Sequence, residues 1–163
     1  MIRKKRFFVQ ILAFIFLLPV FCMAQSATMP AFKMQLTNGK IFSSSALSDK
    51  KPTILIYFAP DCGHCQLLMN ELFKKINDFK SAQIVMVTFE PTKELIGFEK
   101  HYQTSKYPNI IVGSELPVFF FRSYYQLDRT PFTALFDKKH KTVVSYKEQT
   151  PVDGLIKKLK AVQ

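Results

Sequence analysis

The chain has 163 residues, 48% of them hydrophobic, and its 23 Lys and Arg against 12 Asp and Glu give a formal net charge of +11 at pH 7. This length suits one domain with a sizeable core. The sequence contains no Gly-rich phosphate loop, Ser-His-Asp set, internal repeat or nucleic-acid-binding motif. We therefore expect the positive charge to form a solvated surface, and we expect no nucleic acid as a partner.

The first 24 residues are typical of a signal peptide. Basic residues at positions 3–6 precede an apolar run from Phe7 to Phe21, and Ala24 provides the small residue of the expected cleavage site. A membrane helix needs about 20 apolar residues, whereas this run is shorter and is broken by Gln10 and Pro19. The sequence therefore predicts export to the periplasm or the extracellular space, with an uncleaved membrane tether as the alternative.

Cleavage after Ala24 would leave residues 25–163 as a single domain. Four basic residues lie in the leader, so this domain keeps 19 basic and 12 acidic side chains, a net charge of +7. Cys22 would leave with the leader. The domain would then hold two cysteines, Cys62 and Cys65.

The first half of the domain predicts a hairpin, a buried strand and a helix. Residues 32–36 alternate between apolar and polar side chains, Asn38-Gly39 is a strong turn signal, and Ile41-Phe42 begins a return strand. Residues 54–58 form an apolar run typical of a buried strand. The helix after Cys62 should turn four side chains toward the sheet: Leu68, Leu72, Ile76 and Phe79.

Two further strands and a helix are expected next. Residues 83–89 are apolar and should lie parallel to the preceding strand through a right-handed helical crossover. Residues 93–103 read as a helix, and we expect it to bury three side chains: Leu95, Ile96 and Phe98. A short apolar piece at 110–112 is a candidate strand.

An aromatic-rich helix is predicted after that piece, with Ser114 as its N-cap and Pro117 in its first turn. Its aromatic side chains are either core or a partner-binding groove, and core packing is the preferred interpretation: Phe119, Phe120, Phe121, Tyr124 and Tyr125. A hairpin over 133–137 and 142–147 follows. Thr150 and Pro151 then open the last helix as its cap and first residue.

The Cys62-Gly63-His64-Cys65 segment is the strongest functional signal. It follows the buried strand across a Pro60-Asp61 turn, which should place Cys62 at a helix N-terminus. Unsatisfied backbone N–H groups and the helix dipole favour an anion there, and the thiolate is the reactive form of cysteine. We therefore predict Cys62 as the nucleophile and Cys65, one turn inside the helix, as the resolving thiol.

Gly63 and His64 should tune this pair. Gly63 allows a partner backbone to approach, and a charged His64 adds positive potential beside Cys62. Asp61, as a like charge, acts in the opposite direction on the pKa of Cys62.

Other uses of the two cysteines fit less well. A ring with two residues inside it removes little chain entropy, which argues against a structural staple. Zinc would need two more ligands, whereas His101 and His140 lie in segments that read as polar surface. Covalent haem attachment would need a histidine at position 66, which is Gln66. We expect no metal and no cofactor.

On these residues the chain resembles the thioredoxin-like thiol–disulfide oxidoreductases, and the Gly-His pair is similar to the protein disulfide isomerase form of the motif. A second match is Thr130-Pro131 followed by a strand and Asp137, which is similar to the family's threonine and cis-proline. The N-terminal hairpin resembles that of the secreted TlpA-like redoxins. The resemblance implies an α/β thioredoxin-like fold, a central mixed sheet flanked by helices with an added N-terminal hairpin.

The resemblance also implies that Thr130 and Pro131 lie beside the cysteines and bind the substrate backbone. Three departures from the family are visible. Ile56 replaces a buried carboxylate six residues before Cys62, Leu68 replaces a glutamate of TlpA-like members, and Asn70 replaces a helix proline. The proton acceptor of Cys65 is therefore unassigned.

The sequence thus predicts an exported thiol–disulfide oxidoreductase that acts on protein thiols or disulfides. It needs a redox partner to recycle the cysteine pair, and a membrane-bound protein is one candidate for that partner. A non-catalytic module that holds a client or a metal through Cys62 and Cys65 is the alternative. A thiol peroxidase is disfavoured because the peroxide-binding Pro-x-x-x-Thr/Ser-x-x-Cys stretch of peroxiredoxins would need a proline at Leu55 or Phe58.

Overall fold

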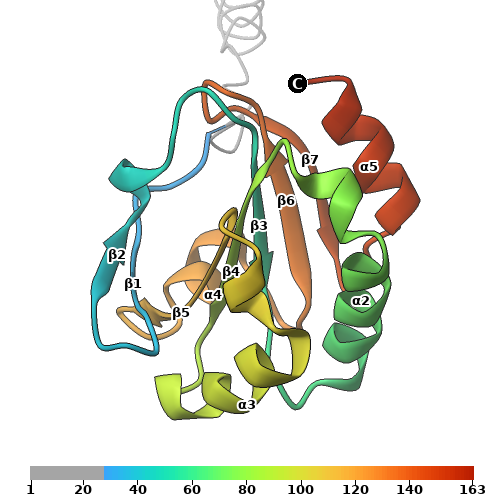
Figure 1. Ribbon diagram of the computed structural model, residues 1–163. Helices are drawn as coiled ribbons and strands as arrows, with labels where there is room; N and C mark the ends of the chain where they lie inside the picture. The colour runs from blue at the N-terminus through green and yellow to red at the C-terminus, as the bar shows by residue number, and fades with distance from the viewer. Residues whose placement is uncertain (1–27) are drawn as a thin grey trace, which may run out of the picture.

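The computed structural model of the protein describes residues 28–163, so the predicted signal peptide lies outside the described residues. The described chain forms one seven-stranded sheet in the order β2-β1-β5-β4-β3-β6-β7, with helices packed on it (Figure 1). The strands are β1 (Lys33–Gln35), β2 (Ile41–Ser43), β3 (Thr53–Tyr57), β4 (Gln83–Thr88), β5 (Ile110–Leu116), β6 (Phe132–Phe136) and β7 (Thr142–Lys147). The helices are α2 (Gly63–Lys74), α3 (Thr92–Tyr102), α4 (Phe120–Tyr125) and α5 (Val152–Lys160), and 3-10 turns span Ser44–Ala46, Ile76–Phe79 and Thr104–Lys106.

The sheet is mixed, as the sequence predicts. β3 pairs in parallel with β4 and β4 with β5, and the remaining neighbours are antiparallel. All five residues of β3 are buried, as are five of the six residues of β4. Strands buried on both faces read as continuous apolar runs, which explains why both were visible in the sequence.

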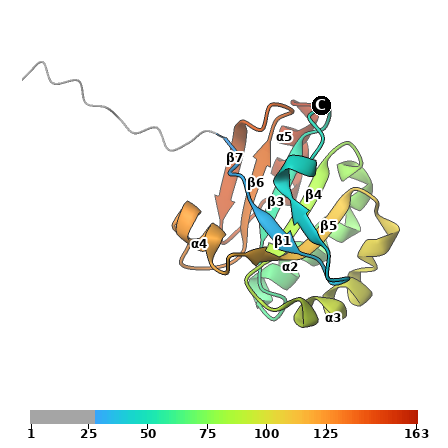
Figure 2. The same ribbon diagram turned by 90° about the vertical axis from the view of Figure 1, so that its left-hand side faces the viewer.

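Alternate residues of β3 enter two different cores. Ile54 and Ile56 join the core that α2, α3 and α5 cover. Leu55 and Tyr57 join the core that α4 and the segment around β1 cover. Figure 2 shows the β1–β2 hairpin on the near side of the sheet and α2 and α5 on its far side. The four predicted inward residues of α2 and the turn after it are all buried: Leu68, Leu72, Ile76 and Phe79.

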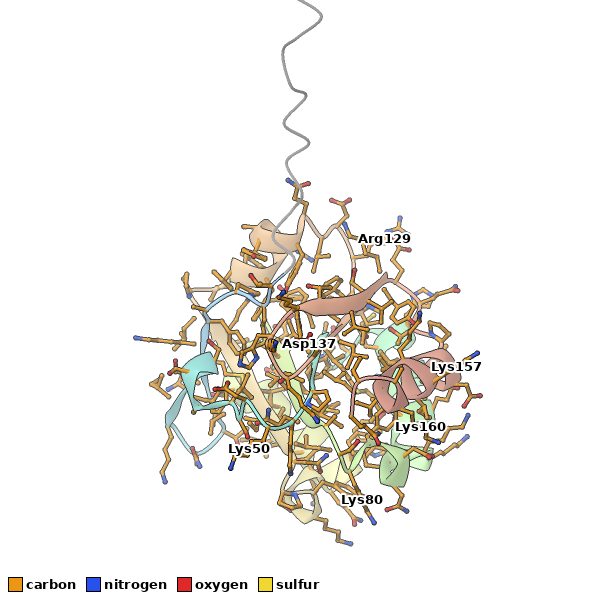
Figure 3. The ribbon with its side chains drawn as sticks, turned by 90° about the horizontal axis from the view of Figure 1, so that it is seen from above. Lys50, Lys80, Arg129, Asp137, Lys157 and Lys160 are labelled. Atoms are coloured by element: carbon orange, nitrogen blue, oxygen red, sulfur yellow. The ribbon has the colours of Figure 1, made fainter. Side chains whose placement is uncertain are left out.

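The segments of the cysteine motif lie together at one end of the central strands. β3 ends at Tyr57, which lies opposite Phe132 at the start of the antiparallel strand β6. The chain therefore brings Pro131 to the point where β3 turns into α2. At the opposite end of β6, Thr28 pairs with Lys141 in the β6–β7 turn. Figure 3 looks onto that end of the molecule and shows four labelled lysines below and to the right of Asp137: Lys50, Lys80, Lys157 and Lys160.

The predicted helix with Ser114 as its cap is wrong. β5 continues to Leu116, because Ser114 pairs with Thr88 of β4 and with Gln35 of β1. The Ser114 hydroxyl donates to the carbonyl oxygen of Glu90 instead of capping a helix. A cis Leu116–Pro117 peptide bond follows the strand, and α4 begins only at Phe120.

Two smaller predictions are also wrong. Leu95 and Phe98 are buried under α3, but Ile96 is 60% exposed because its position on the helix points away from the sheet. Thr150 does not cap the last helix. Its hydroxyl donates to Thr133 Oγ1 at 2.7 Å, which satisfies a buried polar group of β6.

The aromatic segment is core in part. Phe121 is fully buried, and Phe120 and Tyr125 pack against the same core. Core packing is wrong for Phe119 and Tyr124, which are 45% and 40% exposed.

A buried carboxylate that the sequence did not reveal holds the aromatic segment in place. Glu115 accepts hydrogen bonds from the Tyr57 hydroxyl at 2.9 Å and from the backbone N–H groups of Phe119 and Phe121 at 2.8 Å. Burial raises the pKa of Glu115. Three donors satisfy one buried side chain, which is the condition under which a carboxylate is tolerated in a core.

Candidate active site

Cys62 is the residue immediately before helix α2. Its backbone is extended, with φ −76° and ψ 119°, and its N–H donates to the carbonyl oxygen of Ala59 at 3.1 Å. The carbonyl of Cys62 accepts the N–H of Gln66, the first hydrogen bond of the helix. The predicted place of Cys62 at a helix N-terminus is thus confirmed, and its side chain is partly exposed.

The surroundings of Cys62 favour its thiolate. Partial burial raises the pKa of the Cys62 thiol, but hydrogen bonds from the Thr130 side chain, from Cys65 and from the backbone N–H of His64 outweigh it, so the pKa is lowered overall. In its protonated form the thiol donates to the carbonyl oxygen of Thr130, with 3.6 Å between sulfur and oxygen. The lowered pKa means that a larger share of Cys62 is ionised at neutral pH than of a free thiol.

Cys65 has the opposite environment. It is 1% exposed and belongs to the core formed with Phe58 and Met69. Burial raises the pKa of Cys65 to about 12, although the Thr130 side chain and the backbone at Ala59 oppose that shift. Both cysteines are free thiols in this structure.

Thr130 and Pro131 lie where the sequence predicts. The Thr130–Pro131 peptide bond is cis, which confirms that prediction. The residues immediately precede β6, and the Thr130 carbonyl lies against the Cys62 sulfur. Segments 68 residues apart in the chain therefore meet at the motif.

Gly63 and His64 are both exposed in the first turn of α2. No other part of the described chain lies within 4 Å of the place where a side chain on Gly63 would begin. The open space before Gly63 is therefore available to a partner molecule. The group of His64 that acts on Cys62 here is its backbone N–H, a group that any residue except proline would supply.

The departures from the family pattern are visible in the core. Ile56 and Leu68 are buried among apolar side chains of the α2 face, so neither position offers a carboxylate to Cys65. Within residues 28–163 there is no group of three or more His, Cys, Asp and Glu side chains that could hold a metal ion. Across the same residues, no helix has both the length and the apolar character needed to cross a membrane.

Sequence reasoning missed the residues that line a hollow near the motif. Gln66 and Asn70 of α2 face His101 and Tyr102 of α3 across a hollow near the motif. The sequence placed His101 on a polar surface, and no local signal connects it with a cysteine that lies 36 positions earlier in the chain.

Residues 26–158 match the AhpC/TSA family. The chain belongs to the AhpC/TSA family. No curated protein sequence is significantly similar to it. With its C-x-x-C pair, this redoxin is a thiol–disulfide oxidoreductase.

Solved structures with the same fold cover nearly the whole described domain. A secreted Mycobacterium tuberculosis disulfide oxidoreductase homologous to E. coli DsbE is 15% identical, with a TM-score of 0.65, and the match covers 80% of this chain and 95% of that one. The exposed lipoprotein thioredoxin Etrx1 of Streptococcus pneumoniae is 20% identical, with a TM-score of 0.61 and coverage of 81% and 99%. A thioredoxin-like protein of Porphyromonas gingivalis is 18% identical, with a TM-score of 0.67 and coverage of 85% and 93%. The predicted thioredoxin-like fold with an added hairpin is confirmed.

Proposed function

We propose that the protein is an exported, TlpA-like thiol–disulfide oxidoreductase that exchanges disulfides with protein substrates, with Cys62 as the attacking and Cys65 as the resolving thiol. The contrast between the two thiols carries the proposal. Cys62 is partly exposed and its pKa is lowered, whereas Cys65 is buried and its pKa is raised. A substrate disulfide that approaches from solvent meets the more readily ionised thiol first.

In the reductive direction, the Cys62 thiolate attacks one sulfur of a substrate disulfide. The substrate S–S bond breaks, its second sulfur leaves as a thiolate that takes a proton from solvent, and a mixed disulfide joins Cys62 to the substrate. Cys65 then loses its proton and attacks the Cys62 sulfur. The bond from Cys62 to the substrate breaks, and the products are a Cys62–Cys65 disulfide and a reduced substrate. Reversal of these steps oxidises the substrate.

The Thr130–Pro131 segment is proposed to bind the substrate backbone. Its carbonyl lies 3.6 Å from the Cys62 sulfur, so a chain segment bonded to that sulfur would pass directly over this loop. The space in front of Gly63 allows the same segment to approach from the helix side.

Export and recycling complete the proposal. The basic and apolar N-terminal pattern supports a cleaved leader over residues 1–24. The secreted and lipoprotein redoxins among the similar structures are consistent with an exported domain. Each catalytic cycle changes the oxidation state of the pair, so a second protein must return two electrons or remove them, and a membrane-bound redox protein fits that need.

Trapping of mixed disulfides tests the proposal. In Cys65→Ser the first step remains and the second is blocked, so substrates should accumulate on Cys62 in the exported fraction. Cys62→Ser is the matched control and should trap almost none. Equal trapping by both variants would contradict the assigned roles. Absence of trapping together with tight, stoichiometric copper binding by the reduced protein would favour the binding-module alternative.

A further inference from the structure

Resolution of a mixed disulfide requires Cys65 to lose a proton inside the protein. The thiol is 1% exposed, and apolar side chains of β3 and α2 surround it. A void of about 10 Å³ lies against it, lined by Gln66 and Tyr102 together with apolar and aromatic residues. No carboxylate lines this void. Its size matches a single water molecule.

A larger hollow of about 320 Å³ adjoins that void. Residues of α2 and α3 line it, and Figure 1 shows where these two helices lie relative to β3. The hollow and the void adjoin along the four lining residues that they share: Pro60, Gln66, Phe98 and Tyr102. The larger hollow is open and also borders Gly97 and His101. It therefore opens to solvent beside an imidazole and adjoins the void that lies against Cys65.

The polar walls of the hollow are held by hydrogen bonds. The Tyr102 hydroxyl donates to Asn70 Oδ1 at 2.9 Å, and Gln66 Nε2 donates to the Pro60 carbonyl at 3.1 Å. The His101 ring stands edge-on to the Tyr102 ring, with 4.6 Å between centroids. The Tyr102–Asn70 bond joins α3 to α2, and the amide, hydroxyl and imidazole groups all line the same hollow.

Few ionisable groups face this hollow. Tyr102 and His101 are the titratable residues that line the hollow, and Cys62 is the charged neighbour of Cys65 on the other side. Burial raises the pKa of Tyr102, so its hydroxyl stays protonated and serves as a donor. The His101 imidazole is the one nitrogen base among the side chains that line the hollow.

We propose that the hollow between α2 and α3 is the proton exit of Cys65, and that His101 accepts this proton through water when Cys65 attacks the mixed disulfide. The inference rests on the proposed function. The Cys65 S–H bond breaks as the Cys62–Cys65 bond forms, the imidazole gains the proton, and the substrate sulfur leaves as a thiolate. His101 later releases the proton to solvent, to which the hollow is open. In the mixed disulfide Cys62 carries no charge, so it no longer opposes ionisation of Cys65.

Single-turnover kinetics test this inference. A fluorescent peptide disulfide is mixed with the reduced protein, and formation and decay of the mixed disulfide are followed from pH 5 to 9. We expect His101→Gln to leave formation unchanged and to slow decay about tenfold at neutral pH, a modest share of what a positioned base contributes. The decay rate of this variant should also depend less on pH than that of the wild type.

Two further variants make the result specific. Gly97→Leu keeps His101 but fills the hollow, and its Cβ would meet no described atom within 4 Å apart from its chain neighbours and the backbone of its own helix. It should slow decay in the same way. His140→Gln, whose ring instead bonds Asp49 at 2.9 Å, should leave decay unchanged.

The outcomes separate the inference from the function on which it rests. Unchanged decay and an unchanged pH profile in His101→Gln, with normal formation, would overturn the proton exit and leave the proposed function standing. Failure of the wild type and of Cys65→Ser to form any mixed disulfide would overturn both.

Discussion

Cys62 and Cys65 are three positions apart at the start of one helix, yet they differ in exposure and their pKa values are shifted in opposite directions. Cys62 precedes the first turn of α2, is partly exposed and has a lowered pKa. Cys65 lies inside that turn, contacts the core and has a pKa raised to about 12. One helical turn therefore separates a thiol that solvent and the helix N-terminus stabilise as an anion from one that the core keeps protonated.

This contrast supports the proposed order of the two reactions, because the backbone places the two thiols in different surroundings. The same chemical group is reactive or protected according to whether the free N–H groups of the helix or the apolar core face it. Thr130 is the feature that the two environments share, since its side chain hydrogen-bonds to both sulfurs and favours both thiolates.

The largest expected effect comes from removing each thiol in turn. Cys62→Ser should reduce the rate of exchange with a peptide disulfide by roughly three orders of magnitude or more, because the nucleophile is lost. Cys65→Ser should retain the first chemical step at nearly the wild-type rate and stop at the mixed disulfide. Mass spectrometry of quenched reactions measures both. Comparable first-step rates in the two variants would break the contrast.

Alkylation of the wild-type protein should show the same contrast without mutation. The pKa of Cys65 is about 12, whereas an ordinary thiol has a pKa of about 8.5 and that of Cys62 is lowered. At neutral pH the thiolate fraction of Cys62 should thus exceed that of Cys65 by roughly 10³ or more. Iodoacetamide labelling across pH, read by peptide mapping, tests it, and preferential labelling of Cys65 would contradict it.

The two shifts also have opposite consequences for the stability of the reduced protein. The lowered pKa of Cys62 adds stability that is present above the unfolded pKa and is lost as pH falls through the folded one. The raised pKa of Cys65 adds stability that is present below the unfolded pKa and is lost as pH rises toward about 12. Denaturation of the reduced protein between pH 6 and 10 measures both slopes.

Thr130→Val should weaken both thiolates together. The substitution keeps the shape of the side chain and removes the hydroxyl that hydrogen-bonds to the two sulfurs. A hydrogen bond to a charged group contributes about 1.5 kcal/mol, so both pKa values should rise by about one unit. Thiolate absorbance against pH measures the change. Thr150→Val, which removes a hydroxyl bonded to Thr133, is the control and should shift neither.

The smallest effect is expected for His64→Ala. The imidazole is exposed, and the His64 group that lowers the pKa of Cys62 is the backbone N–H, which alanine keeps. We expect the pKa of Cys62 to rise by less than about half a unit, because water and salt screen an exposed charge. The reduction potential should move slightly toward that of a weaker oxidant. If neither quantity changes, His64 has no tuning role.

The sequence by itself determined those strands, turns and helices whose patterns involve only residues close together in the chain. The apolar runs of β3 and β4, the Asn38-Gly39 hairpin turn and the spacing of Cys62 and Cys65 each depend on neighbours within a few residues. For this reason the sequence sufficed to predict the strand–turn–helix of the motif and the position of Cys62 at a helix start.

Tertiary structure decided wherever the partner lies far away in the chain. Serine is a common helix N-cap, but Ser114 pairs with strand β1 on one side and with strand β4 on the other. It is therefore part of β5. Glu115 looks like a surface carboxylate until Tyr57 and two backbone N–H groups enclose it. His101 lines a hollow with Gln66 and Asn70 only because α3 packs beside α2. Residue type and the local hydrophobic pattern do not predict these contacts. The packing of segments that are distant in the chain determines how deeply a side chain is buried, and burial in turn shifts its pKa.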